Sequence, residues 1–113
     1  MPITNQQVAG HAFLHLMQED PYFPGSVVSR GKAILARLCK RIEVERPADL
    51  EGLYVLTQAA TEEFNLLDSD SVAAWDGIET VGREWICEEF CFIASAYGYT
   101  DADPEELTAN RDW

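Results

Sequence analysis

Apolar residues recur at intervals of three and four along most of this chain, which is the spacing of an amphipathic helix. The pattern first runs over about residues 5–18 and ends at the Pro- and Gly-rich segment EDPYFPG. A second helix is expected over residues 26–45, where Ser26 is a favourable N-cap and Pro47 follows the end. Two amphipathic helices are thus predicted in the first half.

A third helix is expected after ADLEGLY, with Asp49 as its N-cap and apolar positions that continue to Leu67. The next residues, DSDS, predict a loop. VAAW then predicts a short turn that lays Trp75 against the core.

A fourth helix is expected from residue 77 or 78 to Tyr97, and Gly98 follows it at the position that favours a left-handed backbone. Asp103, followed by proline, predicts the start of a short C-terminal helix. No segment alternates in polarity as a strand does, and no repeat or linker divides the chain. The sequence therefore predicts an all-α protein of one domain, residues 1–113, built as a compact bundle of four main helices plus the short C-terminal helix.

Charge is distributed unevenly along this pattern. The net charge is −12, but residues 1–46 carry +2 and residues 47–113 carry −14. A field of that sign repels nucleic acid phosphates and anionic membranes, so neither is an expected partner. It favours a basic protein as the partner, and the alternative interpretation is that the acidic residues only keep the protein soluble.

The N-terminal segment lacks the basic residues and the cleavage pattern of a signal peptide, and no apolar run is long enough to span a bilayer. Three cysteines, an odd number, argue against a disulfide framework. We therefore expect a cytoplasmic protein with reduced thiols, either a monomer or a homodimer that pairs through an exposed apolar patch.

The stretch CEEFC places Cys87 and Cys91 one helical turn apart, and His11 and His15 have the same spacing in the first helix. If the two helices meet, the four side chains could form a tetrahedral Cys₂His₂ site for Zn²⁺. The C-x₃-C spacing is unusual for a structural zinc site, and the helical wheel places both thiols at the border of the apolar face. The alternative is two half-exposed histidines and two small, adaptable thiols, with no cofactor.

Glu89 falls in the middle of the apolar arc of the fourth helix. A bare carboxylate there would cost on the order of several kcal/mol, so it needs partners. The candidates are Arg30, Arg37, Arg41, Tyr54, Thr57 and His15. One interpretation is a buried polar network that sets the helix register, and the other is a carboxylate in a ligand pocket. Gly82, on the same arc, predicts a close helix approach.

Five blocks of the chain are typical of one family: LTQAATEEFN (56–65), IETVGREWICEEFCFIASAYGY (78–99), ELTANRDW (106–113), DPYFPGSVV (20–28) and RIEVERPADLEGLY (41–54). They resemble a small bacterial family known only as a domain of unknown function, which ends in R-D-W. The resemblance implies a stand-alone helical protein and supplies no activity or ligand. It includes Glu88 and Glu89 but not the cysteine pair, and it implies that Arg111, Asp112 and Trp113 are docked.

Two functions fit these observations. The favoured one is a non-enzymatic protein-interaction module that binds a basic partner, as small acidic immunity or inhibitor proteins bind basic toxins, which is an argument by analogy. The alternative is a small-ligand or metal-binding helical bundle with a pocket at Glu89, involving Arg37, Arg41 or Tyr54. An enzyme is less favoured, because the sequence has no phosphate-binding loop and no nucleophile with a specified base.

Overall fold

The computed structural model describes residues 3–69, 75 and 77–113. The regular elements in these residues are six α-helices: α1 (Gln6–Ala9), α2 (His15–Glu19), α3 (Gly25–Glu45), α4 (Leu50–Asp68), α5 (Glu79–Ala96) and α6 (Pro104–Leu107). No strand occurs in the described ranges, so the predicted all-α class is confirmed. None of these helices is both long and apolar enough to cross a membrane. Asp68 ends α4 and Ser69 caps it, whereas the second half of the predicted DSDS loop and the VAA part of the predicted turn lie outside the described residues.

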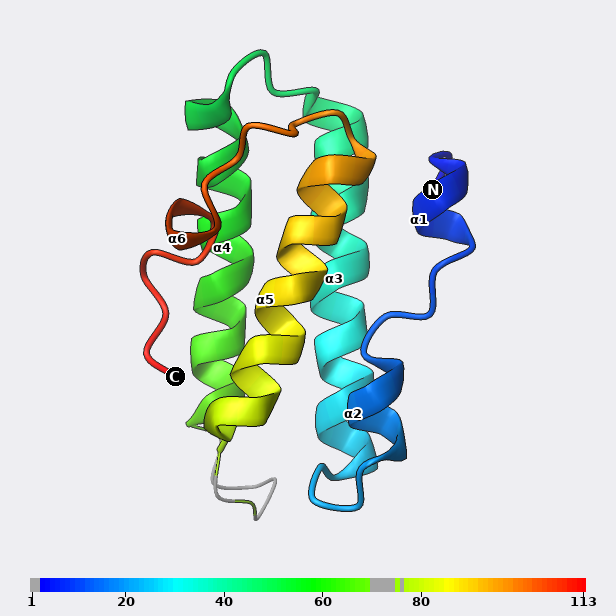
Figure 1. The fold of residues 1–113 in the computed structure, drawn as a ribbon, viewed down its shortest axis with the longest axis vertical. Helices are drawn as coiled ribbons and strands as arrows, with labels where there is room; N and C mark the ends of the chain where they lie inside the picture. Colours follow the sequence, from blue (N-terminus) through cyan, green and yellow to red (C-terminus); the bar gives the residue numbers. More distant parts are fainter. Residues whose placement is uncertain (1–2, 70–74, 76) are drawn as a thin grey trace.

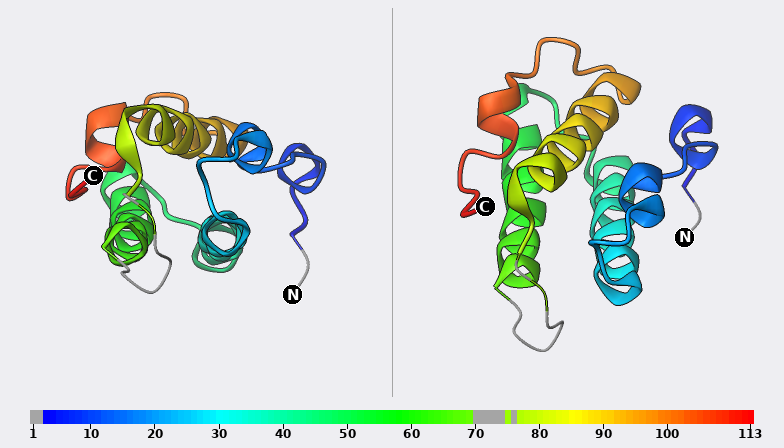
Figure 2. Two further views of the ribbon diagram at one scale, coloured as in Figure 1. Left: turned by 90° about the horizontal axis from the view of Figure 1, so that it is seen from below. Right: turned by 60° about the horizontal axis from the view of Figure 1, so that its bottom comes forward.

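The three long helices α3, α4 and α5 form the centre of the molecule (Figure 1). α3 and α4 run antiparallel side by side, and α5 packs across them, so that the three form a triangle when seen end-on (Figure 2). The short helices α1 and α2 flank α3 and α5, while α6 lies on the other side, against α4 and α5. The two ends of the chain therefore cover opposite flanks of one three-helix core.

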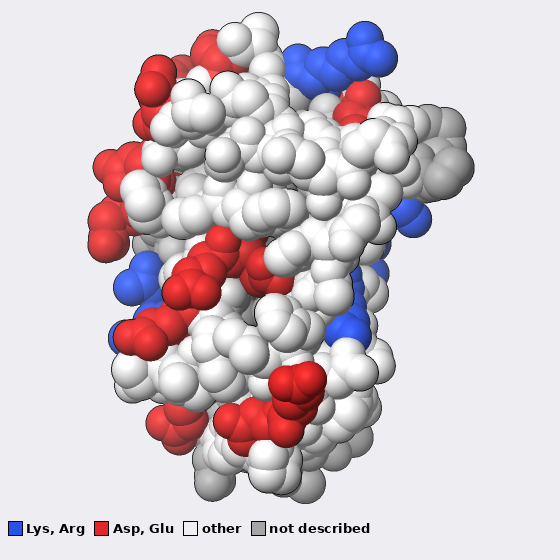
Figure 3. Space-filling model, turned by 45° about the vertical axis from the view of Figure 1, so that its right-hand side comes forward, with Lys and Arg blue, Asp and Glu red and all other residues white. Residues whose placement is uncertain are grey.

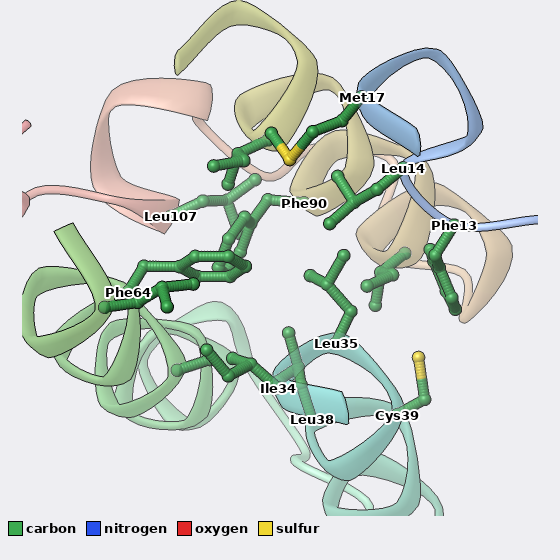
Figure 4. Packing of buried hydrophobic residues seen from close by; sticks show 14 of the residues in the cluster. Phe13, Leu14, Met17, Ile34, Leu35, Leu38, Cys39, Phe64, Phe90 and Leu107 are labelled. Carbon is green, nitrogen blue, oxygen red and sulfur yellow. The ribbon is translucent and has the colours of Figure 1, made fainter. Parts of the chain in front are cut away.

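Both ends also contribute side chains to that core (Figure 4). The N-terminal segment inserts Phe13, Leu14 and Met17, and α6 inserts Leu107. They join fully buried side chains of the long helices, including Leu35, Leu53, Phe64, Phe90 and Ile93. Because apolar burial is the main favourable term in folding, the short segments are part of the stable structure rather than additions to it.

Local sequence signals explain most helix ends. The Asp49 side chain accepts a hydrogen bond from the backbone N–H of Gly52 at 2.8 Å, and Asp103 caps α6 in the same way. Gly98 follows α5 with φ +89°, the left-handed conformation that glycine adopts without a steric penalty. These predicted caps are confirmed, whereas α3 begins one residue early, at Gly25, after a proline that offers no capping side chain.

The single N-terminal helix predicted over residues 5–18 is wrong. α1 ends after one turn at Gly10, and α2 begins only at His15. Between them Leu14 has φ +56° and ψ +31°, a left-handed conformation that costs about 1–2 kcal/mol for a residue with a side chain. The described ranges of the bundle consequently contain three main helices and three short ones, instead of four main helices and one short one.

The close approach predicted at Gly82 exists, but its partner is not a helix. A Cβ at this position would lie 3.1 Å from ring atoms of Phe23, which belongs to the loop before α3. Glycine in α5 therefore makes room for an aromatic ring of the loop.

The C-terminal residues are docked along α4. Asn65 donates from Nδ2 to the carbonyl oxygen of Asn110 at 3.0 Å, and its Oδ1 accepts from the N–H of Asp112 at 2.9 Å. Trp113 meets the ring of Phe64 edge to face, with centroids 6.0 Å apart. Arg111 donates to the Thr108 hydroxyl at 3.3 Å.

Candidate functional site at His11 and Glu89

Glu89 lies on the buried face of α5, as the helical wheel predicts. The residue is 8% exposed, and its neighbours along that face, Ile86, Phe90 and Ile93, are fully buried. Both carboxylate oxygens are used: Oε1 lies 2.8 Å from Nε2 of His11, and Oε2 accepts from the backbone N–H of Leu14 at 2.7 Å. Since a carboxylate only accepts hydrogen bonds, Nε2 is the donor in the contact with Oε1.

Aromatic contacts fix the orientation of the His11 ring. It stacks on Phe92 with centroids 4.1 Å apart and an interplanar angle of 24°. Phe13 meets it edge to face at 4.9 Å. The imidazole is therefore held by two rings and one carboxylate, and Nε2 points at α5.

The same carboxylate explains the break between α1 and α2. The Leu14 N–H that Glu89 accepts belongs to the residue in the left-handed conformation. The Leu14 side chain then packs over Gly31 of α3, where a Cβ would lie only 2.8 Å from Leu14 Cδ1. A hydrogen bond to a charged group, about 1.5–3 kcal/mol, is of the same size as the backbone strain it offsets.

A pocket of about 150 Å³ opens beside the pair, between the N-terminal segment and α5. Its lining residues are His11, Leu14, His15, Leu16, Trp85, Glu88 and Glu89. His15, named in the sequence analysis as a partner for Glu89, lines this pocket, while the hydrogen bond to Glu89 comes from His11. The structure thus places a cavity beside the buried carboxylate.

Three of the other predicted partners of Glu89 bind elsewhere. Arg37 pairs with Glu63 at 2.5 Å, Arg41 pairs with Glu45 at 2.8 Å, and the Tyr54 oxygen accepts from the N–H of Asp103 at 2.9 Å. Arg37 and Arg41 project from the flank of α3 that faces α4, where a separate surface pocket is lined by both. The hydrogen bonds of Glu89 come instead from His11 and Leu14 of the N-terminal segment.

The four predicted zinc ligands are not assembled into a site. Nowhere in the described ranges do three or more His, Cys, Asp or Glu side chains form a group that could hold a metal ion. Cys87 Sγ lies 3.9 Å from the Thr108 hydroxyl. Burial, followed by the charges of Cys87 and Glu88, raises the pKa of the Cys91 thiol. A raised pKa disfavours the thiolate that binds metals.

A second carboxylate, Glu43 of α3, also binds the N-terminal segment, and the sequence did not predict this role. It accepts hydrogen bonds from the backbone N–H groups of Thr4, at 2.9 Å, and Asn5, at 3.1 Å, and from the Tyr97 hydroxyl. Burial would raise the pKa of the Glu43 carboxyl, but these hydrogen bonds outweigh it and lower the pKa to about 2. Burial and the bond to Glu43 raise the pKa of Tyr97.

Some of these contacts had a signal in the sequence. Gly10, directly before His11, disfavours a continuous helix, so the loop that carries His11 could have been anticipated. Glu43 follows the buried Cys39 by one helical turn, which places it at the edge of the apolar face. Nothing in the sequence singles out the Leu14 N–H, because every non-proline residue has a backbone N–H.

Comparison with known proteins places the chain in a family. A model of a family of unknown function, DUF5713, matches residues 7–113. The chain belongs to this family. The match confirms the resemblance to a family of unknown function, and the family description assigns no activity to His11, Glu89 or any other residue. No curated protein and no solved structure matches this DUF5713 chain.

Proposed function

We propose that this DUF5713 protein is a non-enzymatic interaction module that binds a basic surface of another protein. The proposal includes a bacterial, cytoplasmic setting, and an immunity- or inhibitor-like role toward a basic toxin is one form of it. It rests on the exposure of the acidic side chains in the second half of the chain and on how few of them are paired.

Many of these side chains are exposed and make no hydrogen bond or ion pair within the described part of the chain: Glu51, Glu79, Glu84, Glu88, Asp101, Glu105, Glu106 and Asp112. Groups of acidic residues are visible across the face drawn in Figure 3, while the Lys and Arg side chains seen there lie toward its edges. Uncompensated charge of one sign raises the rate of association with a partner of the opposite sign.

The protein's own cations neutralise little of this half, although Arg37 of α3 pairs with Glu63. Residues 47–113 contain two arginines, Arg83 and Arg111. Arg111 donates to a threonine hydroxyl, and the Nε of Arg83 is buried without a partner in the described residues. The remaining Lys and Arg residues come from α3 and the residue that caps it. The acidic half is therefore available to a basic surface.

The test is affinity capture followed by measurement on purified partners. The immobilised protein is exposed to a lysate at about 50 mM salt, and each captured protein is purified and its Kd is measured from about 50 to 500 mM salt. We expect partners with a basic contact surface whose Kd rises steeply with salt. We also expect weaker binding to a double variant, Glu84→Gln with Glu105→Gln.

A matched control removes the same charge from the other half, with Glu19→Gln and Glu45→Gln. Glu19 is exposed, and Glu45 forms an exposed pair with Arg41 that contributes little to stability. This control should leave the Kd within about twofold. Equal weakening by both double variants, or a Kd that does not change with salt, would contradict the proposal.

A second candidate function is the binding of a small ligand at Glu89. The observation that favours it is the pocket of about 150 Å³ beside the His11–Glu89 pair. Such a volume is below the roughly 300–1,000 Å³ of pockets for drug-sized molecules, so the ligand has to be small. This candidate is independent of the acidic surface, and saturable binding of a small molecule that shifts the Trp85 signal would establish it.

A further inference from the structure

We infer that the pocket between α2 and α5 binds a primary ammonium group carried on a short apolar chain. The inference rests on the second candidate function above and names the ligand of that site. It follows from the charge, the walls and the volume of the pocket.

The lining residues include two carboxylates, Glu88 and Glu89, two histidines and no Lys or Arg. Glu89 uses one acceptor site on each oxygen, for His11 and for the Leu14 N–H. A carboxylate offers about four such sites, so each oxygen can accept one more donor. Glu88 is exposed and makes no hydrogen bond or ion pair within the described part of the chain. An ammonium group, with three donors, satisfies both carboxylates.

The walls favour an organic cation over a metal ion. Trp85, Leu14 and Leu16 supply apolar surface, and an indole face attracts a cation placed over it. Leu16 is 45% exposed, so apolar surface continues from the pocket toward solvent. No metal-binding group of three side chains exists here among the described residues, and Ca²⁺ or Zn²⁺ requires at least that many protein ligands.

The volume sets the size of the ligand. An engineered protein cavity of about 150 Å³ holds benzene, so a pocket of about 150 Å³ takes roughly six non-hydrogen atoms. n-Butylammonium fits this limit, and n-butanol is its neutral counterpart of equal length. The same ammonium chemistry has two sources, a free amine and the lysine side chain of a protein.

The experiment is a titration of the full-length protein with n-butylammonium, followed by the indole N–H signals in NMR spectra. The chain has three tryptophans, of which Trp85 lines the pocket and Trp113 lies against α4. We expect the Trp85 signal to move saturably while the Trp113 signal stays in place. Glu88→Gln should raise the Kd about tenfold, because it removes a charged acceptor without removing any contact that holds the fold.

Glu84→Gln is the matched control, since it removes the same charge from an exposed position of α5 outside the pocket. It should change the Kd less than twofold. Equal binding of n-butanol would overturn the inference while leaving a small-ligand pocket in place. If neither compound moves the Trp85 signal, both the inference and the second candidate function are wrong.

A second titration separates the two sources. Nα-acetyl-lysine methylamide presents the same ammonium group on a peptide backbone, which stays outside a pocket of this size. Tighter binding of this compound than of n-butylammonium supports a lysine of a partner protein, and the reverse supports a free amine. Failure of both compounds to bind contradicts the inference from either source.

Discussion

The two ends of the chain are docked on the same three-helix core by different chemistry. The N-terminal strap, residues 3–19, is held by two carboxylates, Glu43 and Glu89, which accept its backbone N–H groups. The C-terminal strap, residues 104–113, is held mainly by amide and hydroxyl side chains, with Asn65 of α4 as donor and acceptor. Both straps insert side chains into the core, so the difference lies in the polar anchors.

The two kinds of anchor are therefore expected to differ both in the strength of their hydrogen bonds and in their dependence on pH. A hydrogen bond to an ionised carboxylate is roughly twice as strong as one between neutral groups, but it is weakened when the carboxylate is protonated. An amide side chain has no such titration, so its hydrogen bonds are the same at every moderate pH. We therefore expect the N-terminal strap to be the more tightly anchored end near neutral pH and the more acid-sensitive one.

The largest effect on the free energy of unfolding is expected at Glu89. Glu89→Ala leaves the Leu14 N–H without its acceptor and His11 without its partner, and it removes what holds Leu14 in the left-handed conformation. We expect the free energy of unfolding to fall by about 2–4 kcal/mol in urea titrations. Glu84→Ala, an exposed position of the same helix, should change it by less than about 0.5 kcal/mol. Equal effects of the two variants would mean that Glu89 is not an anchor.

The second effect is the pH dependence contributed by Glu43. The pKa of its carboxyl is about 2 in the folded protein against an ordinary value of 4.5, so the stabilisation is complete above about pH 4.5 and declines as the pH falls toward 2. Glu43→Gln should lower the free energy of unfolding by about 1–2 kcal/mol near pH 6. The gap between the wild type and this variant should narrow near pH 3, as measured in urea titrations at both pH values. A gap that is the same at both would show that the carboxylate charge does not hold the strap.

The sequence predicted the helices of the core better than it predicted the straps. Helices α3 and α4 follow from long apolar periodicity and from signals such as Asp49 and Pro47, which act locally. The strap around Leu14 has the same periodicity, but a contact with α5 decides its conformation. Periodicity reports which residues are buried, and it does not distinguish a continuous helix from two short pieces that bury the same residues.

The candidate site shows the same limit. The burial of Glu89 could be predicted, because its position on the wheel depends on α5 alone. Its partner could not, since that depends on which element covers α5. Arginines of α3 were among the predicted partners of Glu89, whereas the observed partner, His11, comes from the loop between α1 and α2. Once the first helix is drawn as continuous, the imidazole and the Leu14 N–H cannot both reach one carboxylate.

The smallest effect on the free energy of unfolding is expected at Asn65, the anchor of the C-terminal strap. Asn65→Asp keeps the acceptor for the N–H of Asp112 but replaces the donor to the Asn110 carbonyl, now 3.0 Å away, with a carboxylate oxygen. The facing oxygens raise the pKa of the new carboxyl group above its ordinary value of about 3.9. The variant should therefore be about 1 kcal/mol less stable than the wild type near neutral pH. That deficit should shrink as the pH falls, because the protonated group donates to Asn110 again.

The pH dependence of the two variants, Glu43→Gln and Asn65→Asp, tests the comparison between the two anchors. Lowering the pH is expected to weaken the carboxylate anchor at Glu43 and to strengthen the artificial one at position 65. Both are read as the difference in free energy of unfolding from the wild type at about pH 6 and pH 3, so the general acid response of the protein cancels. Both differences should therefore become smaller at about pH 3, the first because the wild type loses the charge of Glu43 and the second because the variant regains a donor at position 65. A difference that stays the same at both pH values would show that ionisation of that anchor does not set the pH dependence of its strap.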